Sequence, residues 1–270
     1  MFDLNIIRPP AVAGKFYPQE PRQLENDVRQ MLDAADVVEC RPKILIAPHA
    51  GYEYSGPIAA SAFATLESGR GAIQRVVILG TCHTSRDPII FTTSADSFET
   101  PLGSIKTDAS SIQLAVGQGL AALDDQVHQF DHAIEVQLPF LQLTLDSFEI
   151  APFLVRNADT EEVARLIRLL WGGAETRFVI SSDLSHYQRY ERALKIDQQT
   201  AEFIVQLDHM PLDQSRACGF RAIAGALQVA REKSLQCMKL DLRNSGDTSG
   251  HKDRVVGYGA FAFCLNDKTT

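Results

Sequence analysis

Three stretches of the chain share one pattern, a short run of apolar, mostly β-branched residues that ends at a polar turn containing a histidine. Such unbroken apolar runs are typical of parallel strands that are buried on both faces of a sheet. In α/β proteins, the carboxyl ends of these strands hold the ligand crevice. If the three strands lie in one sheet, their histidines converge. The runs are residues 44–47, 76–79 and 178–180, followed by His49, His83 and His186.

The remaining pattern alternates helices and strands. Helical spacing of apolar residues predicts one helix that begins at Pro21 and others over residues 57–66, 110–116, 192–207 and 216–231. It also predicts a helix over residues 131–141, which Pro139 would bend. Short apolar runs predict strands over residues 88–91, 148–155, 238–242 and 255–265. No linker, repeat or low-complexity tract interrupts this order, so we expect residues 1–270 to form one α/β domain.

Composition narrows the function classes. The chain has 34 acidic and 26 basic residues and a net charge of −8, which argues against a nucleic-acid surface. No apolar run is long enough to span a membrane, and the N-terminus lacks a secretory leader, so we expect a cytoplasmic protein without membrane contact. The five cysteines include no CxxC pair and are expected to be reduced thiols.

The histidines that end the strands are the first candidates for chemistry. A cluster of imidazoles beside a carboxylate is typical of a metal or acid–base site, although a single strand-end histidine can also simply cap a turn. Cys82 precedes His83 and is a candidate nucleophile. Neighbouring residues at a strand end point in opposite directions, which weakens that reading.

Further polar residues occur at helical or loop spacing. Asp183 and His186 are three residues apart and could share a site, or Asp183 could cap a helix. His132 and Glu135 have the same spacing, which would allow the carboxylate to orient the imidazole or place both on a solvated face. The loop of residues 244–251 is a turn that could also supply a hydroxyl or carboxylate. The histidines without a strand-end position are expected at the surface, namely His128, His209 and His251. No P-loop, GxGxxG, HExxH or GxSxG motif occurs.

Several segments together resemble the Memo family, also called AmmeMemoRadiSam system protein B. The resemblance covers nearly the whole chain and is carried by residues 8–18 (RPPAVAGKFYP), 47–56 (APHAGYEYSG), 79–83 (LGTCH), 131–140 (DHAIEVQLPF), 181–187 (SSDLSHY) and 244–247 (NSGD). It implies a single three-layer domain with a mixed central β-sheet flanked by helices, similar to class III extradiol dioxygenases, which use non-haem Fe(II).

The resemblance also implies roles for individual residues. His49 and His83 match metal ligands of those dioxygenases, His132 and His186 match histidines that handle substrate protons, and Asp183 matches a pocket aspartate. The dioxygenases use a glutamate as third ligand, for which the closing loop here offers Asp247 or Ser245. Aspartate is the better ligand for iron.

Two functions of different classes follow. The first is a non-haem Fe(II)-dependent, dioxygenase-like oxidoreductase, with another divalent metal as an alternative and metal-assisted hydrolysis ranked behind it. The second is a binding module without turnover that reads a peptide or small ligand through the same cleft. Tyr54 is a further pocket candidate. The family resemblance also implies a radical-SAM protein and an Amme-type protein as partners.

Overall fold

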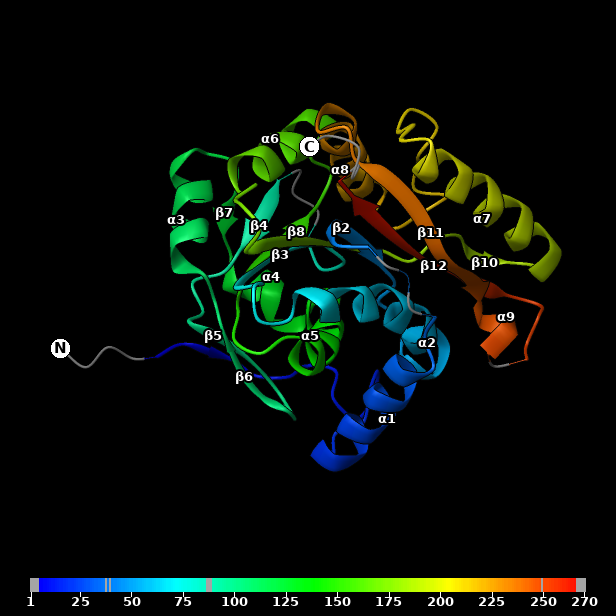
Figure 1. Ribbon diagram of the computed structural model, residues 1–270, viewed down its shortest axis with the longest axis horizontal. Helices are drawn as coiled ribbons and strands as arrows, with labels where there is room; N and C mark the ends of the chain where they lie inside the picture. The colour runs from blue at the N-terminus through cyan, green and yellow to red at the C-terminus, as the bar shows by residue number, and fades with distance from the viewer. Residues whose placement is uncertain (1–4, 37, 39, 86–88, 249, 266–270) are drawn as a thin grey trace.

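The computed structural model describes residues 5–36, 38, 40–85, 89–248 and 250–265, and a mixed β-sheet runs through its centre (Figure 1). Four neighbouring strands of this sheet are parallel, in the order β2 (Pro42–Ala47), β9 (Thr176–Ser181), β3 (Arg75–Thr81) and β8 (Glu149–Val155). They include all three apolar runs that end near a histidine. The expectation that these runs lie side by side in one sheet is therefore confirmed.

Antiparallel strands extend this parallel centre on both sides. Beyond β2 lies β12 (Val255–Cys264), which pairs with β11 (Gln236–Asn244) and β10 (His186–Gln188). Beyond β8 lie β4 (Ile90–Thr92) and β7 (Ala122–Leu123). A separate small sheet contains β1 (Ile7–Arg8), β5 (Ser97–Thr100) and β6 (Gly103–Lys106). The predicted mixed sheet is thus present.

Helices cover both faces of the central sheet. Successive residues of a strand point to opposite faces, and accordingly Leu45 joins one hydrophobic cluster while Ile44 and Ile46 join another. The first cluster includes α1 (Pro21–Asp33), α2 (Tyr52–Phe63) and α5 (Leu138–Thr144). The second includes α6 (Thr160–Leu169), α7 (Tyr190–Val205) and α8 (Phe220–Glu232). The chain is therefore a three-layer α/β structure (Figure 1).

The remaining helical segments are short and lie at the ends of strands or in connections. They are η1 (Ala64–Gly69), α3 (Ala109–Gly117), α4 (Asp125–Phe130), η2 (Glu135–Gln137) and α9 (Ser245–Thr248). Among the helices that the structure describes, none combines the length and the apolar character of a membrane span.

Two helix predictions need correction at prolines. The small-residue helix begins at Tyr52 rather than at residue 57, so Pro57 lies inside α2. Residues 131–141 do not form one bent helix, because Pro139 stands in the first turn of α5, where its missing N–H costs no hydrogen bond. The preceding residues form an irregular turn and η2. This difference decides where His132 and Glu135 point.

Two further expectations are wrong. The structure joins Cys40 to Cys264 by a disulfide that links the segment before β2 to the last residue of β12, so the cysteines are not all reduced thiols. His128, which we expected at the surface because it lacks a strand-end position, is 2% exposed. Its Nε2 lies 3.4 Å from the carbonyl oxygen of Phe91, and its ring meets Phe98 edge-on.

Candidate metal centre

The register of the parallel strands brings distant polar residues to one edge of the sheet. Ala47 pairs with Ser181, and Ser181 pairs with Gly80. Because β2, β9 and β3 run in the same direction, the residues that follow them share this edge. His49 lies two residues beyond β2, and His83 lies two residues beyond β3.

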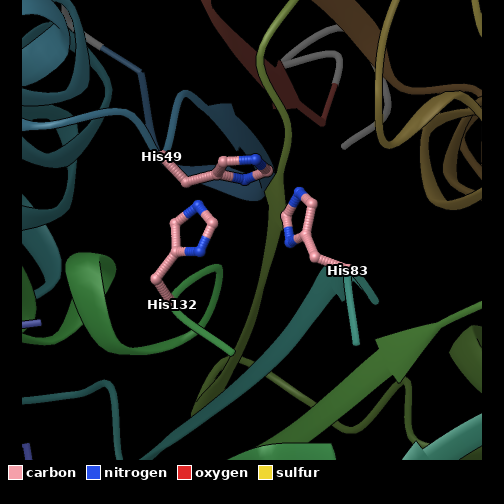
Figure 2. Close-up of side chains that lie close together, drawn as sticks. All are labelled: His49, His83 and His132. Carbon is pink, nitrogen blue, oxygen red and sulfur yellow. The ribbon is translucent and has the colours of Figure 1, made fainter. Parts of the chain in front are cut away.

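Three imidazoles converge at this edge (Figure 2). His49, His83 and His132 each offer a ring nitrogen, and these nitrogens lie within 4.8 Å of one another. The ring centroids are 5.3 Å apart for His49 and His83, 5.4 Å for His49 and His132, and 4.7 Å for His83 and His132. The predicted convergence of histidines is therefore present, but His132 takes the place that we expected His186 to take.

The hydrogen bonds of His49 fix which of its nitrogens faces the other histidines. The Ser181 hydroxyl donates to the carbonyl of Ala133 at 2.6 Å, so it can only accept from His49 Nδ1, which lies 2.9 Å away. Gln137 donates to the same hydroxyl oxygen at 2.8 Å and to the Pro48 carbonyl at 2.9 Å. His49 Nε2 is thereby left as the ligand atom.

His83 is oriented by a buried carboxylate. Asp131 is 2% exposed, and its Oδ2 accepts the backbone N–H of His83 at 2.7 Å. Its Oδ1 lies 3.3 Å from His83 Nδ1. A carboxylate that receives the Nδ1 proton leaves Nε2 free, which is the arrangement found behind many metal-binding histidines.

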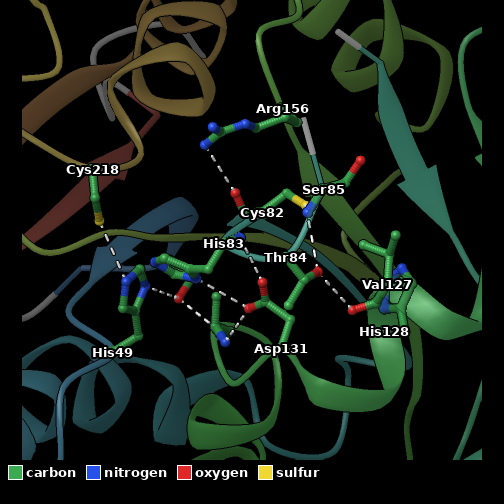
Figure 3. Close-up of polar contacts among 12 residues, drawn as sticks. His49, Cys82, His83, Thr84, Ser85, Val127, His128, Asp131, Arg156 and Cys218 are labelled. Atoms are coloured by element: carbon green, nitrogen blue, oxygen red, sulfur yellow. Dashed lines mark hydrogen bonds and ion pairs between the residues drawn. The ribbon is translucent and has the colours of Figure 1, made fainter. Parts of the chain in front are cut away.

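A cysteine sulfur lies beside the imidazole nitrogens of His49 and His83 as a further potential donor (Figure 3). Cys218 Sγ lies 3.3 Å from His49 Nε2 and also hydrogen-bonds His83. Its backbone N–H donates to the carbonyl of Asp183, and Gly219 N–H donates to the hydroxyl of Ser182. A Cβ atom on Gly219 would lie 2.7 Å from Ser182 Cβ, so only glycine lets this loop approach the end of β9 so closely.

The charges of these groups are coupled. Burial opposes the charged form of His49, but the negative charges of Cys218 and Asp183 outweigh it and raise its pKa to about 9. Burial also opposes charge on His83, whose hydrogen bonds to Asp131 and Cys218 raise its pKa to about 10. Conversely, burial and the two charged imidazoles lower the pKa of His132 to about 4.

Cys218 and Asp131 carry the balancing negative charge. Burial disfavours the Cys218 thiolate, but His49 and His83 lower the pKa of this thiol well below its usual range. Burial likewise raises the pKa of Asp131, yet its hydrogen bonds with His83 lower the pKa to about 2. Without a metal, these shifts favour the charged forms of His49, His83, Cys218 and Asp131 together.

His186 and Asp183 lie next to this group and do not belong to the imidazole cluster. His186 Nδ1 lies 2.8 Å from the carbonyl of Leu184, so Nδ1 carries the proton and Nε2 remains an acceptor. Its side chain lines a cavity together with His83 and Cys218. Asp183 is 5% exposed and accepts the backbone N–H of His49 at 2.8 Å, so it holds the turn that carries this ligand.

Glu135 points away from His132, contrary to the interpretation that it orients this imidazole. It is fully buried and forms an ion pair with Arg8. It also accepts the backbone N–H groups of Ala11 at 2.8 Å and Val12 at 3.0 Å, and the hydroxyl of Tyr17. Glu135 therefore anchors the N-terminal segment, whose Phe16 ring packs on His132 with centroids 4.5 Å apart.

The remaining candidates lie outside the imidazole cluster. Cys82 is fully buried, and its sulfur accepts the N–H of Ser85 at 3.4 Å (Figure 3). Asp247 is exposed on α9 and accepts the hydroxyl of Tyr190 at 2.6 Å. The hydroxyl of Ser245 accepts the N–H of Val256 at 3.1 Å, and Tyr54 is 37% exposed on α2. The closing loop thus provides none of the three clustered ligand atoms.

Sequence reasoning missed two members of the site. Cys218 lies in the connection before α8, 169 residues from His49, and no strand end or motif marks it. Asp131 directly precedes His132, so a carboxylate beside a candidate histidine was the available signal for it.

Comparison with known proteins agrees with this architecture. Residues 8–262 match the family described as Memo-like protein. A MEMO1 family protein of Methanosarcina mazei is 35% identical over 269 residues, covering 94% of this chain and 98% of that protein. MEMO1 family proteins of Saccharolobus solfataricus and Ignicoccus hospitalis are 35% and 36% identical, covering 95% and 96% of this chain and 99% of each relative. The chain therefore belongs to the Memo-like (MEMO1) protein family.

Proposed function

We propose that this protein is a metal-dependent oxidoreductase with a non-haem iron centre and a dioxygenase-like fold. The observation that supports it most directly is the convergence of three imidazoles whose ligand atoms lie within 4.8 Å of one another. His49, His83 and His132 would hold the metal, with the Cys218 sulfur beside them. Imidazole ligands suit iron, copper and zinc alike, and a thiolate adds affinity for the softer of these ions.

The donor set fits a metal ion because two ligands are already oriented for it. Ser181 accepts the Nδ1–H of His49, and Asp131 accepts that of His83, so Nε2 is the nitrogen of each ring that would bind a metal ion, in exchange for its proton. His132 remains neutral because burial and its neighbours disfavour its charged form. A bound ferrous ion would supply redox chemistry with dioxygen at its open positions.

Other residues of this chain would prepare the substrate. His186 lines the cavity and donates its Nδ1–H to Leu184, so its Nε2 would be the atom that takes a proton from a substrate hydroxyl. Asp183 is a positioning residue, since its carboxylate holds the backbone of His49 and its carbonyl accepts the N–H of Cys218. Phe16 covers one side of His132 and excludes water from that ring.

Metal content and oxygen uptake test the proposal together. Protein purified without oxygen is expected to contain about one iron per chain, and the H49A variant is expected to lose it while remaining folded. The matched control is H251A, which replaces an exposed histidine outside the cluster. Retention of the metal by H49A would refute the assigned ligands. Stoichiometric iron without oxygen uptake toward phenolic or enolic compounds would favour a binding module.

A further inference from the structure

A cavity of about 350 Å³ lies beside the metal centre, with His83 and Cys218 in its wall. It opens at the carboxyl ends of β3 and β8 and at the start of α8. Its volume is at the lower end of the range for small-molecule pockets, which is too small for a folded partner. Among the described residues, no aspartate or glutamate lines it, although the chain has more acidic than basic residues.

Two arginines line this cavity without a carboxylate partner. Arg156 follows β8 and donates from Nη1 to the carbonyl of Cys82 at 3.3 Å, and Arg221 in α8 donates from Nη1 to the carbonyl of Ala158 at 3.0 Å. In the part of the chain that the structure describes, neither forms an ion pair. The Nε of each is buried and lacks a hydrogen-bond partner. The Nη2 group of each makes no hydrogen bond among the described residues, so both guanidinium groups retain donors that a ligand could use. The cavity wall therefore presents two guanidinium groups with free N–H donors, which suit an acceptor with several oxygens.

The backbone of the cavity wall has an uncommon conformation at one large residue. Asn157 and Tyr187 both line the cavity, and both have left-handed backbone conformations, with φ of 53° and 56°. This conformation is uncommon for a residue as large as tyrosine, and such strain is found preferentially at functional sites.

We propose that this cavity binds the anionic group of a small organic acid between Arg156 and Arg221. A carboxylate or a phosphate monoester has the charge and the paired oxygens that guanidinium groups bind. The rest of the molecule would then extend toward His83. This inference names the substrate class of the metal centre and in that respect rests on the proposed function.

Binding of simple aromatic probes tests the inference. Calorimetric titrations would compare benzoate, phenyl phosphate and the neutral benzamide, with the protein as purified and after metal removal by a chelator. One of the two anions is expected to bind at least about tenfold more tightly than benzamide, and whichever binds more tightly identifies the anionic group. R156M and R221M are each expected to weaken that anion by about 10- to 100-fold, because a hydrogen bond to a charged group is lost.

Control variants distinguish the effect of the cavity on anion binding from the effects of overall charge and of the metal. R29M removes an exposed arginine on α1 and should leave binding unchanged, while R156K and R221K keep the charge and should lose less affinity than the methionine variants. Equal binding of benzamide and the anions, or no loss in any folded arginine variant, would overturn the inference. Anion binding that is lost when the metal is removed but is unchanged in the arginine variants would also overturn the inference, while leaving the proposed metal centre intact. Arginine-dependent binding by a protein that contains no metal when purified without oxygen would support the inference and refute the proposed function.

Discussion

Replacement of Glu135 by glutamine distinguishes an anchor of the N-terminal segment from a residue that orients His132. The Glu135 carboxylate is fully buried and receives Arg8, two backbone N–H groups and the Tyr17 hydroxyl. Burial and the charge of Glu135 raise the pKa of Tyr17, which therefore stays a donor. A glutamine amide keeps the shape of the side chain but presents an NH₂ group to donors and leaves Arg8 without a counter-charge.

The expected magnitude follows from this geometry. Removal of one partner of a buried ion pair costs about 3–5 kcal/mol. This loss is large beside a total folding free energy of about 5–15 kcal/mol. We therefore expect E135Q to lower the free energy of unfolding by about 3–5 kcal/mol in urea titrations, with the melting temperature reduced accordingly. Metal affinity of the folded variant, measured well below its unfolding transition, should change much less than its stability.

An exposed pair of the same residue types provides the control. Arg29 and Glu25 lie four residues apart on α1, with side chains 52% and 45% exposed. E25Q should change stability by less than about 1 kcal/mol, because exposed ion pairs contribute little. A double-mutant cycle of R8M and E135Q should give a coupling energy of about 2 kcal/mol or more. If E135Q were as stable as the parent protein but bound metal far more weakly, Glu135 would be an orienting residue and our interpretation would be refuted.

Three further results are expected. D131N should weaken metal binding by about 10- to 100-fold with the fold retained, because an amide has one acceptor oxygen and cannot accept both the backbone N–H and the Nδ1–H of His83. Unchanged affinity in a metal titration would contradict this role. Burial lowers the pKa of His128 to about 4, so between pH 6.5 and pH 4 this histidine is protonated in the unfolded chain but not in the folded chain. As pH falls through this range, urea titrations should show a loss of up to about 3 kcal/mol in the free energy of unfolding. The H128Q variant should lack this pH-dependent loss. Burial raises the pKa of Asp197 to about 6, so its ionised form destabilises the fold above that pH. D197N can still accept the N–H of Ser185 and should raise the free energy of unfolding at pH 7.5 but not at pH 4. Destabilisation at both pH values would refute this reasoning.

The central strands and the edge that holds the site could be predicted because buried parallel strands leave a strong local signal. The apolar runs before His49 and His83 identify β2 and β3, and the polar turn that follows each run marks the carboxyl end of the strand. Register and direction then follow from the general geometry of α/β sheets. The antiparallel strands beside them are less regular, since β10 and β4 each contain three residues.

The complete ligand set could not be predicted, because two decisions depend on contacts between distant segments. Helical periodicity assigned His132 and Glu135 to one face, whereas Pro139 starts a new helix, and His132 joins the imidazole cluster while Glu135 binds the N-terminal segment. Cys218 reaches His49 only through the packing of the connection before α8 on the end of β9. A contact between two residues that are 169 positions apart leaves no local pattern in the sequence.

The wide spacing of the ligands also has a consequence during synthesis on the ribosome. His49 and His83 are translated early, but Cys218 belongs to the last quarter of the chain, and the Arg8 segment can dock only after Glu135 has been made. A nascent chain therefore exposes two histidines long before it can enclose an ion. Metal uptake at the proposed centre is therefore expected only once the polypeptide is finished, and the supply of metal at that moment would determine which ion is bound.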